Sequence, residues 1–242
     1  MDVDAVRDGL IAFAEAHQEA LLSFPRRESQ LLELAAMTLA AMHYERAGYQ
    51  VGPSNTGDHT EFRMKLSTRG RPENFSWWTA TRGADSFEIH ANLPVVSAYG
   101  RDNGTYVVDV AVVRAGSLSR LISMGPGRRA LPNAALLTFA EVKRLVVYPM
   151  LLAQFIGIVH EILPRFLGKR RPRGFRSAGH FDPALMSIGY LHSTSRGIVG
   201  AYFDRGYRVS VVTNCDGHIS RLRDSNIPSP LQLRMARTVP QF

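Results

Sequence analysis

The chain of 242 residues is 45% hydrophobic, which suits one large domain with a single substantial core and excludes a disordered chain. Its 29 lysines and arginines outnumber its 21 aspartates and glutamates, and the net charge of +8 predicts attraction to polyanions such as nucleic acid. The single cysteine, Cys215, excludes an intramolecular disulfide and a cysteine-rich zinc site, and no apolar stretch reaches the ~20 residues of a membrane span.

The first 27 residues predict a helical extension before the core domain. Apolar residues recur at helical spacing between residues 4 and 23, and Pro25 closes this helix. The acidic start, MDVDAVRDGL, lacks the basic flank and long apolar core of a secretory signal. Because a lone cysteine also fits a reducing compartment, we expect a cytoplasmic protein.

A second helix and a group of antiparallel strands are predicted next. Apolar spacing predicts a helix from Glu28 to Arg46, and Gly48 suits a left-handed cap before the short strand YQV. The segments FSWWTA, FEIHANLPVVSAY and TYVVDVAVV are rich in β-branched and aromatic residues and are separated by turn sequences. They predict a meander in which Trp77 and Trp78 face opposite sides, and core positions suit both better than a base-stacking surface.

The middle of the chain predicts an insertion, a strand, a helix and a basic linker. Residues 115–135 contain three glycines, two prolines and three arginines, which indicates a long connection or hairpin before the strand LLTFAEVKRLVV. Pro149 begins a helix that extends to about Leu163. The following linker is either a solvated loop or a phosphate-binding segment, and its candidate nucleic-acid contacts are Lys169, Arg170, Arg171 and Arg173.

The last predicted elements form a crossover unit. The segment ALMSIGYLH reads as a strand, residues 194–205 as a helix capped by Ser193 or Thr194, and YRVSVVTN as a second strand. A strand, a helix and a strand in this order predict parallel pairing. We therefore expect a core domain over residues 28–216 and a peripheral tail over residues 217–242.

Three charged residues interrupt two otherwise apolar strands. Glu141 and Lys143 are two positions apart in LLTFAEVKRLVV, so their side chains point to the same face. Asp109 interrupts TYVVDVAVV in the same way, and a lone acid in so apolar a run needs a partner. Because successive strands are usually neighbours, we expect Asp109 and Glu141 side by side, about 5 Å apart.

Two carboxylates at that separation repel each other by about 3 kcal/mol at an effective dielectric of ~20. Lys143 offsets part of this repulsion, and a divalent cation that prefers oxygen ligands, such as Mg²⁺, offsets it more completely. A metal there polarises a phosphoryl oxygen and lowers the pKa of a bound water, while the lysine orients that water. The set predicts phosphodiester hydrolysis, whereas on an exposed strand the same E-x-K triplet is a solvated ion pair.

The order of these residues and elements resembles the PD-(D/E)xK nuclease superfamily over roughly residues 28 to 213. Asp109 on one core strand and Glu141-Val142-Lys143 on the next match the superfamily's motif, although Val108 stands where the motif has proline. The resemblance implies an α/β restriction-endonuclease-like fold. Its αβββαβ core has a mixed central sheet flanked by helices, here with an extra N-terminal helix and an insertion between the catalytic strands.

The resemblance also implies the roles of the site residues. Asp109 and Glu141 are metal ligands and Lys143 serves the attacking water, while Glu33 in the first core helix and Glu88 on a neighbouring strand are candidate further ligands. The implied activity is cleavage of double-stranded DNA by an endonuclease with Mg²⁺, or Mn²⁺ as a substitute. Restriction, repair or antiviral defence, with a homo-oligomer or a partner protein, would fit such an enzyme.

Two other functions remain open on the sequence. A catalytically inactive module of the same fold would use the acids for structure and its basic surface to bind nucleic acid or a partner protein. A nuclease subunit activated by an effector would have the same residues and work only after that effector arrives. The sequence does not decide between DNA and RNA.

Overall fold

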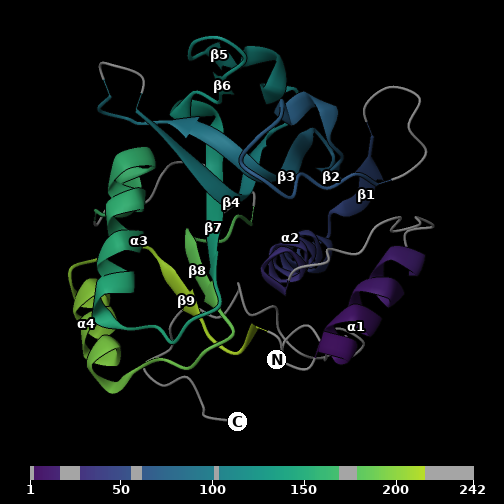
Figure 1. Ribbon diagram of the computed structural model, residues 1–242. Helices are drawn as coiled ribbons and strands as arrows, with labels where there is room; N and C mark the ends of the chain where they lie inside the picture. Colours follow the sequence, from purple (N-terminus) through teal and green to yellow (C-terminus); the bar gives the residue numbers. More distant parts are fainter. Residues whose placement is uncertain (1–2, 17–27, 56–61, 101–103, 169–178, 216–242) are drawn as a thin grey trace.

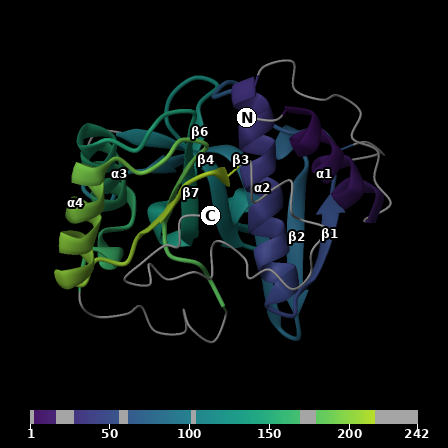
Figure 2. The same ribbon diagram turned by 90° about the horizontal axis from the view of Figure 1, so that it is seen from below.

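Within the described residues, a seven-stranded mixed sheet lies between two pairs of helices in this computed structural model (Figure 1). The structure describes residues 3–16, 28–55, 62–100, 104–168 and 179–215. Helices α1 (Val3–Ala16) and α2 (Glu28–Arg46) lie on one side of the sheet, and α3 (Pro149–Ile162) and α4 (Ser193–Asp204) lie on the other, as Figure 2 shows from below. The predicted α/β class, with a mixed sheet flanked by helices and an extra N-terminal helix, is confirmed.

The strand order across the sheet is β1, β2, β3, β4, β7, β8, β9. Neighbours are antiparallel from β1 to β7, whereas β7, β8 and β9 are parallel and are joined by α3 and α4. The predicted meander and crossover unit are therefore confirmed. The strands are β1 (Gln50–Ser54), β2 (Trp77–Arg82), β3 (Asp85–Val96), β4 (Thr105–Arg114), β7 (Leu136–Lys143), β8 (Ala184–Ser187) and β9 (Ser210–Val212), and short 3-10 helices cover Pro72–Asn74, Ser117–Arg120, Asn133–Ala135 and Pro164–Phe166.

Local chain chemistry explains where the helices begin and end. Gly48, with φ +84°, ends α2, and the N–H of Tyr49 donates to the carbonyl of Tyr44 at 3.0 Å, as a left-handed cap requires. The predicted glycine cap is thus confirmed. The predicted cap of α4 is wrong, because His192 takes that position and its Nδ1 accepts from the N–H of Thr194 at 3.3 Å.

Two apolar cores hold the layers together. One lies between the sheet and α2 and contains Trp78, while the other lies between the opposite face and α3 and α4. Trp77 is half-buried, with its ring centroid 5.6 Å from that of His90. The predicted core position is therefore confirmed for Trp78 and only in part for Trp77. Helix α1 packs on α2 through Val6 and Leu10. No helix in the described part of the chain combines the length and the apolarity needed to cross a membrane.

The insertion at residues 115–135 includes the hairpin of β5 (Ile122–Ser123) and β6 (Arg129–Ala130), at the top of Figure 1. The N–H of Leu131 donates to the carbonyl of Pro94 at 2.8 Å, which attaches the insertion to the end of β3. The insertion leads into the first residue of β7, whereas Lys143 is the last, about 23 Å away at 3.3 Å per residue. It therefore lies away from the candidate site.

The loops that follow β7 and β8 run side by side. A Cβ on Gly189 would lie only 2.7 Å from the carbonyl oxygen of Leu145, so this approach of two backbones requires glycine and ends β8 earlier than predicted. Val147 and Leu191 then form an isolated parallel bridge, in which the N–H of Val147 donates to the carbonyl of Tyr190 at 2.9 Å. Both loops lead from this bridge directly into the first turns of α3 and α4.

Candidate active site

The sheet brings Asp109 and Glu141 next to each other. β4 and β7 are antiparallel, with Val110 opposite Ala140, and the same register continued by one residue places Asp109 opposite Glu141. The backbone N–H of Val142 donates to Asp109 Oδ2 at 2.7 Å. The Asp109 side chain therefore joins the two strands at the point where their regular ladder ends.

Lys143 connects the two acids. Its Nζ donates to Glu141 Oε2 at 3.0 Å and to Asp109 Oδ2 at 3.2 Å. The side chain of Lys143 is 35% exposed, against 16% for Asp109 and 5% for Glu141, so the cluster opens to solvent on the lysine side. Burial lowers the pKa of Lys143, but the charges of Glu141 and Asp109 outweigh it and raise that pKa above its ordinary value. Lys143 is therefore a cation at neutral pH.

The carboxylate of Glu141 is buried beside a second negative charge, which disfavours its ionisation. Its burial, followed by the charge of Asp109, raises the pKa of Glu141 to about 7, although Lys143 opposes the change. Its Oε1 is buried and has no hydrogen-bond partner among the described residues. A buried acceptor left in this state costs about 1–3 kcal/mol. A cation bound at Oε1 would remove this cost and favour the ionised carboxylate.

Asn92, on β3, extends the cluster to a third acid. Its Nδ2 donates to Glu33 Oε2 at 2.8 Å and to the carbonyl of Lys65 at 2.8 Å. Burial raises the pKa of Glu33, and the charges of Asp109 and Lys143 also act on it, the first raising and the second lowering the pKa. Glu33 of α2 therefore lies within electrostatic range of the pair on the sheet, and its expected role as a further metal ligand stays a prediction.

The backbone of Asn92 is unusual for the middle of a strand. Its φ is +50°, in the left-handed region that asparagine tolerates better than most residues. Ala91 packs in the core under α2 and Leu93 in the core under α3, although residues two apart in a regular strand face the same side. The change of face at Asn92 turns its polar groups out of the ladder and toward Glu33 and Lys65.

Lys65 supports this turn from outside the sheet. Its side chain is buried, and Nζ donates to the carbonyls of Asn92 at 2.8 Å and of Ser67 at 2.6 Å. Burial lowers the pKa of Lys65 to about 8, against the opposing effect of Glu33. A buried ammonium that binds two carbonyls holds the polar backbone of Asn92 where a strand neighbour is missing.

Glu88 does not belong to this cluster. It lies opposite Val113, four residues along β4 from Asp109, which is about 13 Å at 3.3 Å per residue. Its Oε2 lies 3.0 Å from His90 Nε2, and its Oε1 accepts from the N–H of Gly116 at 2.8 Å. The expectation that Glu88 contributes to the metal site is therefore wrong in this geometry, because both oxygens serve the local fold.

Other predicted contacts cannot be placed. The linker residues Lys169, Arg170, Arg171 and Arg173 and the tail at 217–242 lie outside the described residues. A broad groove of about 820 Å³ is present elsewhere, lined by residues of α3 and by Tyr106, Tyr202 and Tyr207. None of the residues of the cluster lines it, so the groove is separate from the candidate site. The cluster consists of Glu33, Lys65, Asn92, Asp109, Glu141 and Lys143.

The oxygen donors of the cluster fit a divalent metal in part. Asp109 and Glu141 present oxygen ligands of the kind that Mg²⁺ prefers, and Glu141 Oε1 is an acceptor without a hydrogen-bond partner among the described residues. As placed, no three His, Cys, Asp or Glu side chains in the described part of the chain form a group that could hold a metal ion. The two carboxylates alone would therefore supply only part of the oxygen ligands that such an ion needs.

Sequence reasoning found Asp109, Glu141, Lys143 and Glu33 but missed Asn92 and Lys65. Asn92 stands in an apolar run, FEIHANLPVV, where a polar residue is a usable signal. Lys65 lies in a polar stretch and carries no such signal. No family model, curated protein or solved structure matches the chain. The case for a function therefore depends on this geometry.

Proposed function

We propose that the protein is a metal-dependent endonuclease that hydrolyses DNA phosphodiester bonds. The observation that carries the proposal is the convergence of the half-buried carboxylate of Asp109 and the buried carboxylate of Glu141 on the ammonium of Lys143, at 3.2 and 3.0 Å. This convergence comes from adjacent strands and from an E-x-K triplet within an apolar strand. Burial and the charge of Asp109 raise the pKa of Glu141, and carboxylates perturbed in this way occur often at functional sites, which supports a chemical use of the pair.

The architecture supports the finer assignment to the restriction-endonuclease-like fold. Helix α2 precedes antiparallel β3, β4 and β7, and α3 then leads to β8, which is parallel to β7. This order is compatible with the αβββαβ core that the sequence resemblance implied, with α1, β1, β2, α4, β9 and the insertion at residues 115–135 as additions. A cytoplasmic, homo-oligomeric enzyme in restriction, repair or antiviral defence is part of the same proposal.

The residues take distinct roles in this proposal. Asp109 and Glu141 would hold Mg²⁺, or Mn²⁺ as its substitute, with Glu33 facing the same charges. When bound, the ion supplies polarisation of a phosphoryl oxygen and a lower pKa for its water. Lys143 Nζ orients the attacking water oxygen and offsets the negative charge that develops on the phosphate. Its partial exposure is consistent with direct access to substrate.

A second candidate is a binding module of the same fold without catalysis. The observation that favours it is the internal pairing of Lys143 with both carboxylates, which neutralises part of the cluster without any ion. In that case the acids and the lysine would stabilise the strand ends, and the basic surface would bind nucleic acid or a partner protein. A nuclease that requires an activating effector would share the same resting geometry.

Plasmid cleavage with purified protein tests the proposal. Mg²⁺-dependent nicking should fall at least about 100-fold in Glu141→Gln and Lys143→Met, because each removes a group that acts on the transition state. Glu161→Gln, at the far end of α3, is the control and should keep its activity. Residual cleavage that survives both site variants would sink the nuclease proposal, and DNA binding without any cleavage would favour the module.

A further inference from the structure

Exposed apolar and aromatic side chains gather on the two loops that follow β7 and β8. Seven large hydrophobic side chains are exposed among the described residues. Leu145, Tyr148 and Tyr190 belong to these loops, and Met150 lies in the first turn of α3 that follows. Soluble proteins rarely leave such a group on the surface without a function. With Arg144 and His192, these residues make up a surface that we call the tyrosine patch.

The geometry of the loops explains why the rings face outward. Val147 and Leu191 form the parallel bridge between the loops, and Val147 is fully buried. Residues next to these two along each extended segment point the other way, so Tyr148 and Tyr190 face solvent from neighbouring backbones. Two neighbouring backbones joined by hydrogen bonds therefore each present one exposed ring.

The patch lies beside the candidate active site. Lys143 ends β7 and is paired with Ser187 at the end of β8, immediately before the two loops. Tyr148 is five residues from Lys143, so their Cα atoms are at most about 18 Å apart. At ~3.4 Å per nucleotide, this distance corresponds to about five nucleotides of one strand. The patch therefore lies within the reach of a nucleic-acid strand bound at the site.

The charge around the patch suits a polyanion. Residues 144–150 and 188–196 contain no aspartate or glutamate, and they contain Arg144, His192 and Arg196. Helices α3 and α4 both begin at this end of the sheet, at the bottom of Figure 1, two residues after the Val147–Leu191 bridge. The positive ends of two helix dipoles therefore add to the side-chain charges here.

We propose that the tyrosine patch binds unpaired nucleotides of the substrate, with bases stacked on Tyr148 and Tyr190 and phosphates near Arg144 and the two helix N-termini. Aromatic rings stack on bases that are free of a duplex, because the faces of paired bases are covered by their neighbours. The substrate of the proposed nuclease is then DNA with a single-stranded segment next to the cleaved bond. This inference rests on the proposed function for the position of the cleaved phosphate.

Binding of labelled DNA tests the patch without cleavage. Fluorescence anisotropy in EDTA would compare a short oligothymidine strand with its duplex. Tyr148→Ala and Tyr190→Ala should each weaken single-strand binding about tenfold, and Tyr148→Phe and Tyr190→Phe should keep it, because stacking needs the ring alone. Duplex affinity should change less than threefold in all four variants.

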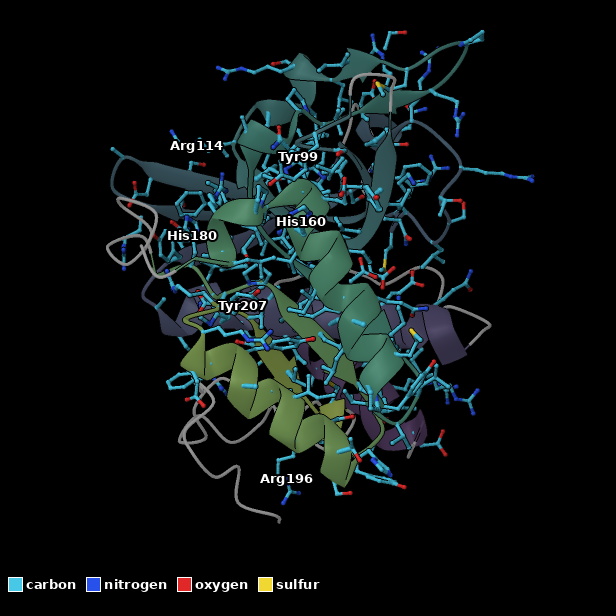
Figure 3. The ribbon with its side chains drawn as sticks, turned by 90° about the vertical axis from the view of Figure 1, so that its left-hand side faces the viewer. Tyr99, Arg114, His160, His180, Arg196 and Tyr207 are labelled. Carbon is cyan, nitrogen blue, oxygen red and sulfur yellow. The ribbon has the colours of Figure 1, made fainter. Side chains whose placement is uncertain are left out.

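Tyr99→Ala is the matched control. Tyr99 is 56% exposed, similar to Tyr190 at 61%, and its ring stacks on His160 with centroids 4.9 Å apart. Figure 3 shows Tyr99 and His160 in the upper half of the molecule and Arg196, which lies in the first turns of α4, at the bottom. Single-strand affinity should therefore be the same in Tyr99→Ala and the unsubstituted protein.

Several results would overturn the patch. The first is no measurable binding of single-stranded DNA by the unsubstituted protein. The second is unchanged single-strand affinity in the variant that combines Tyr148→Ala with Tyr190→Ala. The third is an equal loss of affinity for single strand and duplex in that variant. If the double variant instead dissociates an oligomer while its DNA affinity holds, the patch binds a second copy of the chain. Tyrosine-dependent single-strand binding in a protein that never cleaves DNA with Mg²⁺ would refute the nuclease and leave the patch standing.

Discussion

At the scale of single residues, the cluster opposes folding and favours ligand binding. Glu141 places a carboxylate in a buried position beside Asp109, and both its burial and that neighbouring charge raise its pKa to about 7. Ionisation of Glu141 near neutral pH therefore costs free energy in the folded protein. Stability–function conflicts of this kind are common at active sites, and here the conflict falls on the residue whose Oε1 has no hydrogen-bond partner among the described residues.

Asn92 is the residue whose role can be separated most clearly by substitution. Asn92→Ala removes the hydrogen bonds to Glu33 and Lys65 and also leaves a Cβ residue at φ +50°. Asn92→Gly removes the same bonds but suits that φ. We expect Asn92→Ala to be less stable than Asn92→Gly by about 1 kcal/mol, measured by urea denaturation.

DNA cleavage by Asn92→Ala and Asn92→Gly tests whether Asn92 positions Glu33 for the proposed reaction. Because both variants free Glu33 from the sheet, both should lose activity to a similar extent, about tenfold, with the loss in kcat rather than in KM. Asn92→Asp would place a carboxylate beside Glu33 and should lose more. Equal stability of the alanine and glycine variants would show that the left-handed backbone is not a constraint, and full activity in both would remove Asn92 from the site.

At the scale of elements, sequence periodicity was enough for the main features. The alternation around Asp109, and the E-x-K spacing at Glu141, placed three charged residues on neighbouring strands because strand geometry is local and regular. The predicted helices and the meander followed from the same periodicity. Two features could not be predicted, because they depend on contacts between residues that are distant in sequence. Lys65 holds the backbone of Asn92 where β3 changes face. His192 becomes the N-cap of α4 because its loop is fixed beside Val147, and its ring then accepts from the N–H of Thr194.

The contact between Tyr44 of α2 and His180 makes the stability of the folded protein depend on pH. Tyr44 Oη lies 2.6 Å from His180 Nδ1, and the Tyr44 side chain is fully buried. Burial, and then the charges of His43, Arg114 and Arg165, lower the pKa of His180 to about 4. Figure 3 shows Arg114 and His180 on the same side of the molecule. Between pH about 4 and about 6.5, His180 is therefore mostly neutral in the folded protein and mostly charged in the unfolded chain.

The contact between Tyr44 and His180 predicts that the protein loses stability in mild acid. The folded pKa of about 4 is below the unfolded value of about 6.5, so the unfolded chain binds more protons between these pH values. The contribution of His180 is complete above pH about 6.5 and falls as the pH approaches about 4, by up to about 3 kcal/mol. Urea denaturation at several pH values should show a smaller acid loss in His180→Gln than in the unsubstituted protein. Parallel curves for the two proteins would contradict the argument.

At the scale of the whole molecule, the proposed binding features all lie at one end. The proposed active site, the tyrosine patch and the first turns of α3 and α4 lie at the end of the sheet opposite the insertion hairpin (Figure 1). The net charge of +8 supplies a long-range attraction that is independent of sequence. Such attraction comes from counterion release and must therefore weaken with salt.

The salt dependence of duplex binding tests where the phosphate contacts are. With about four phosphate contacts, affinity should fall roughly 100-fold between about 50 and 200 mM salt. Arg170→Ser with Arg171→Ser should reduce the slope of log K against log salt by nearly two, because each lost contact removes ~0.9. Arg120→Ser with Arg128→Ser, two exposed arginines of the insertion, removes equal charge at the far end and should leave the slope unchanged. Equal reductions in both double variants would mean that net charge alone attracts DNA, and the linker would lose its assigned role.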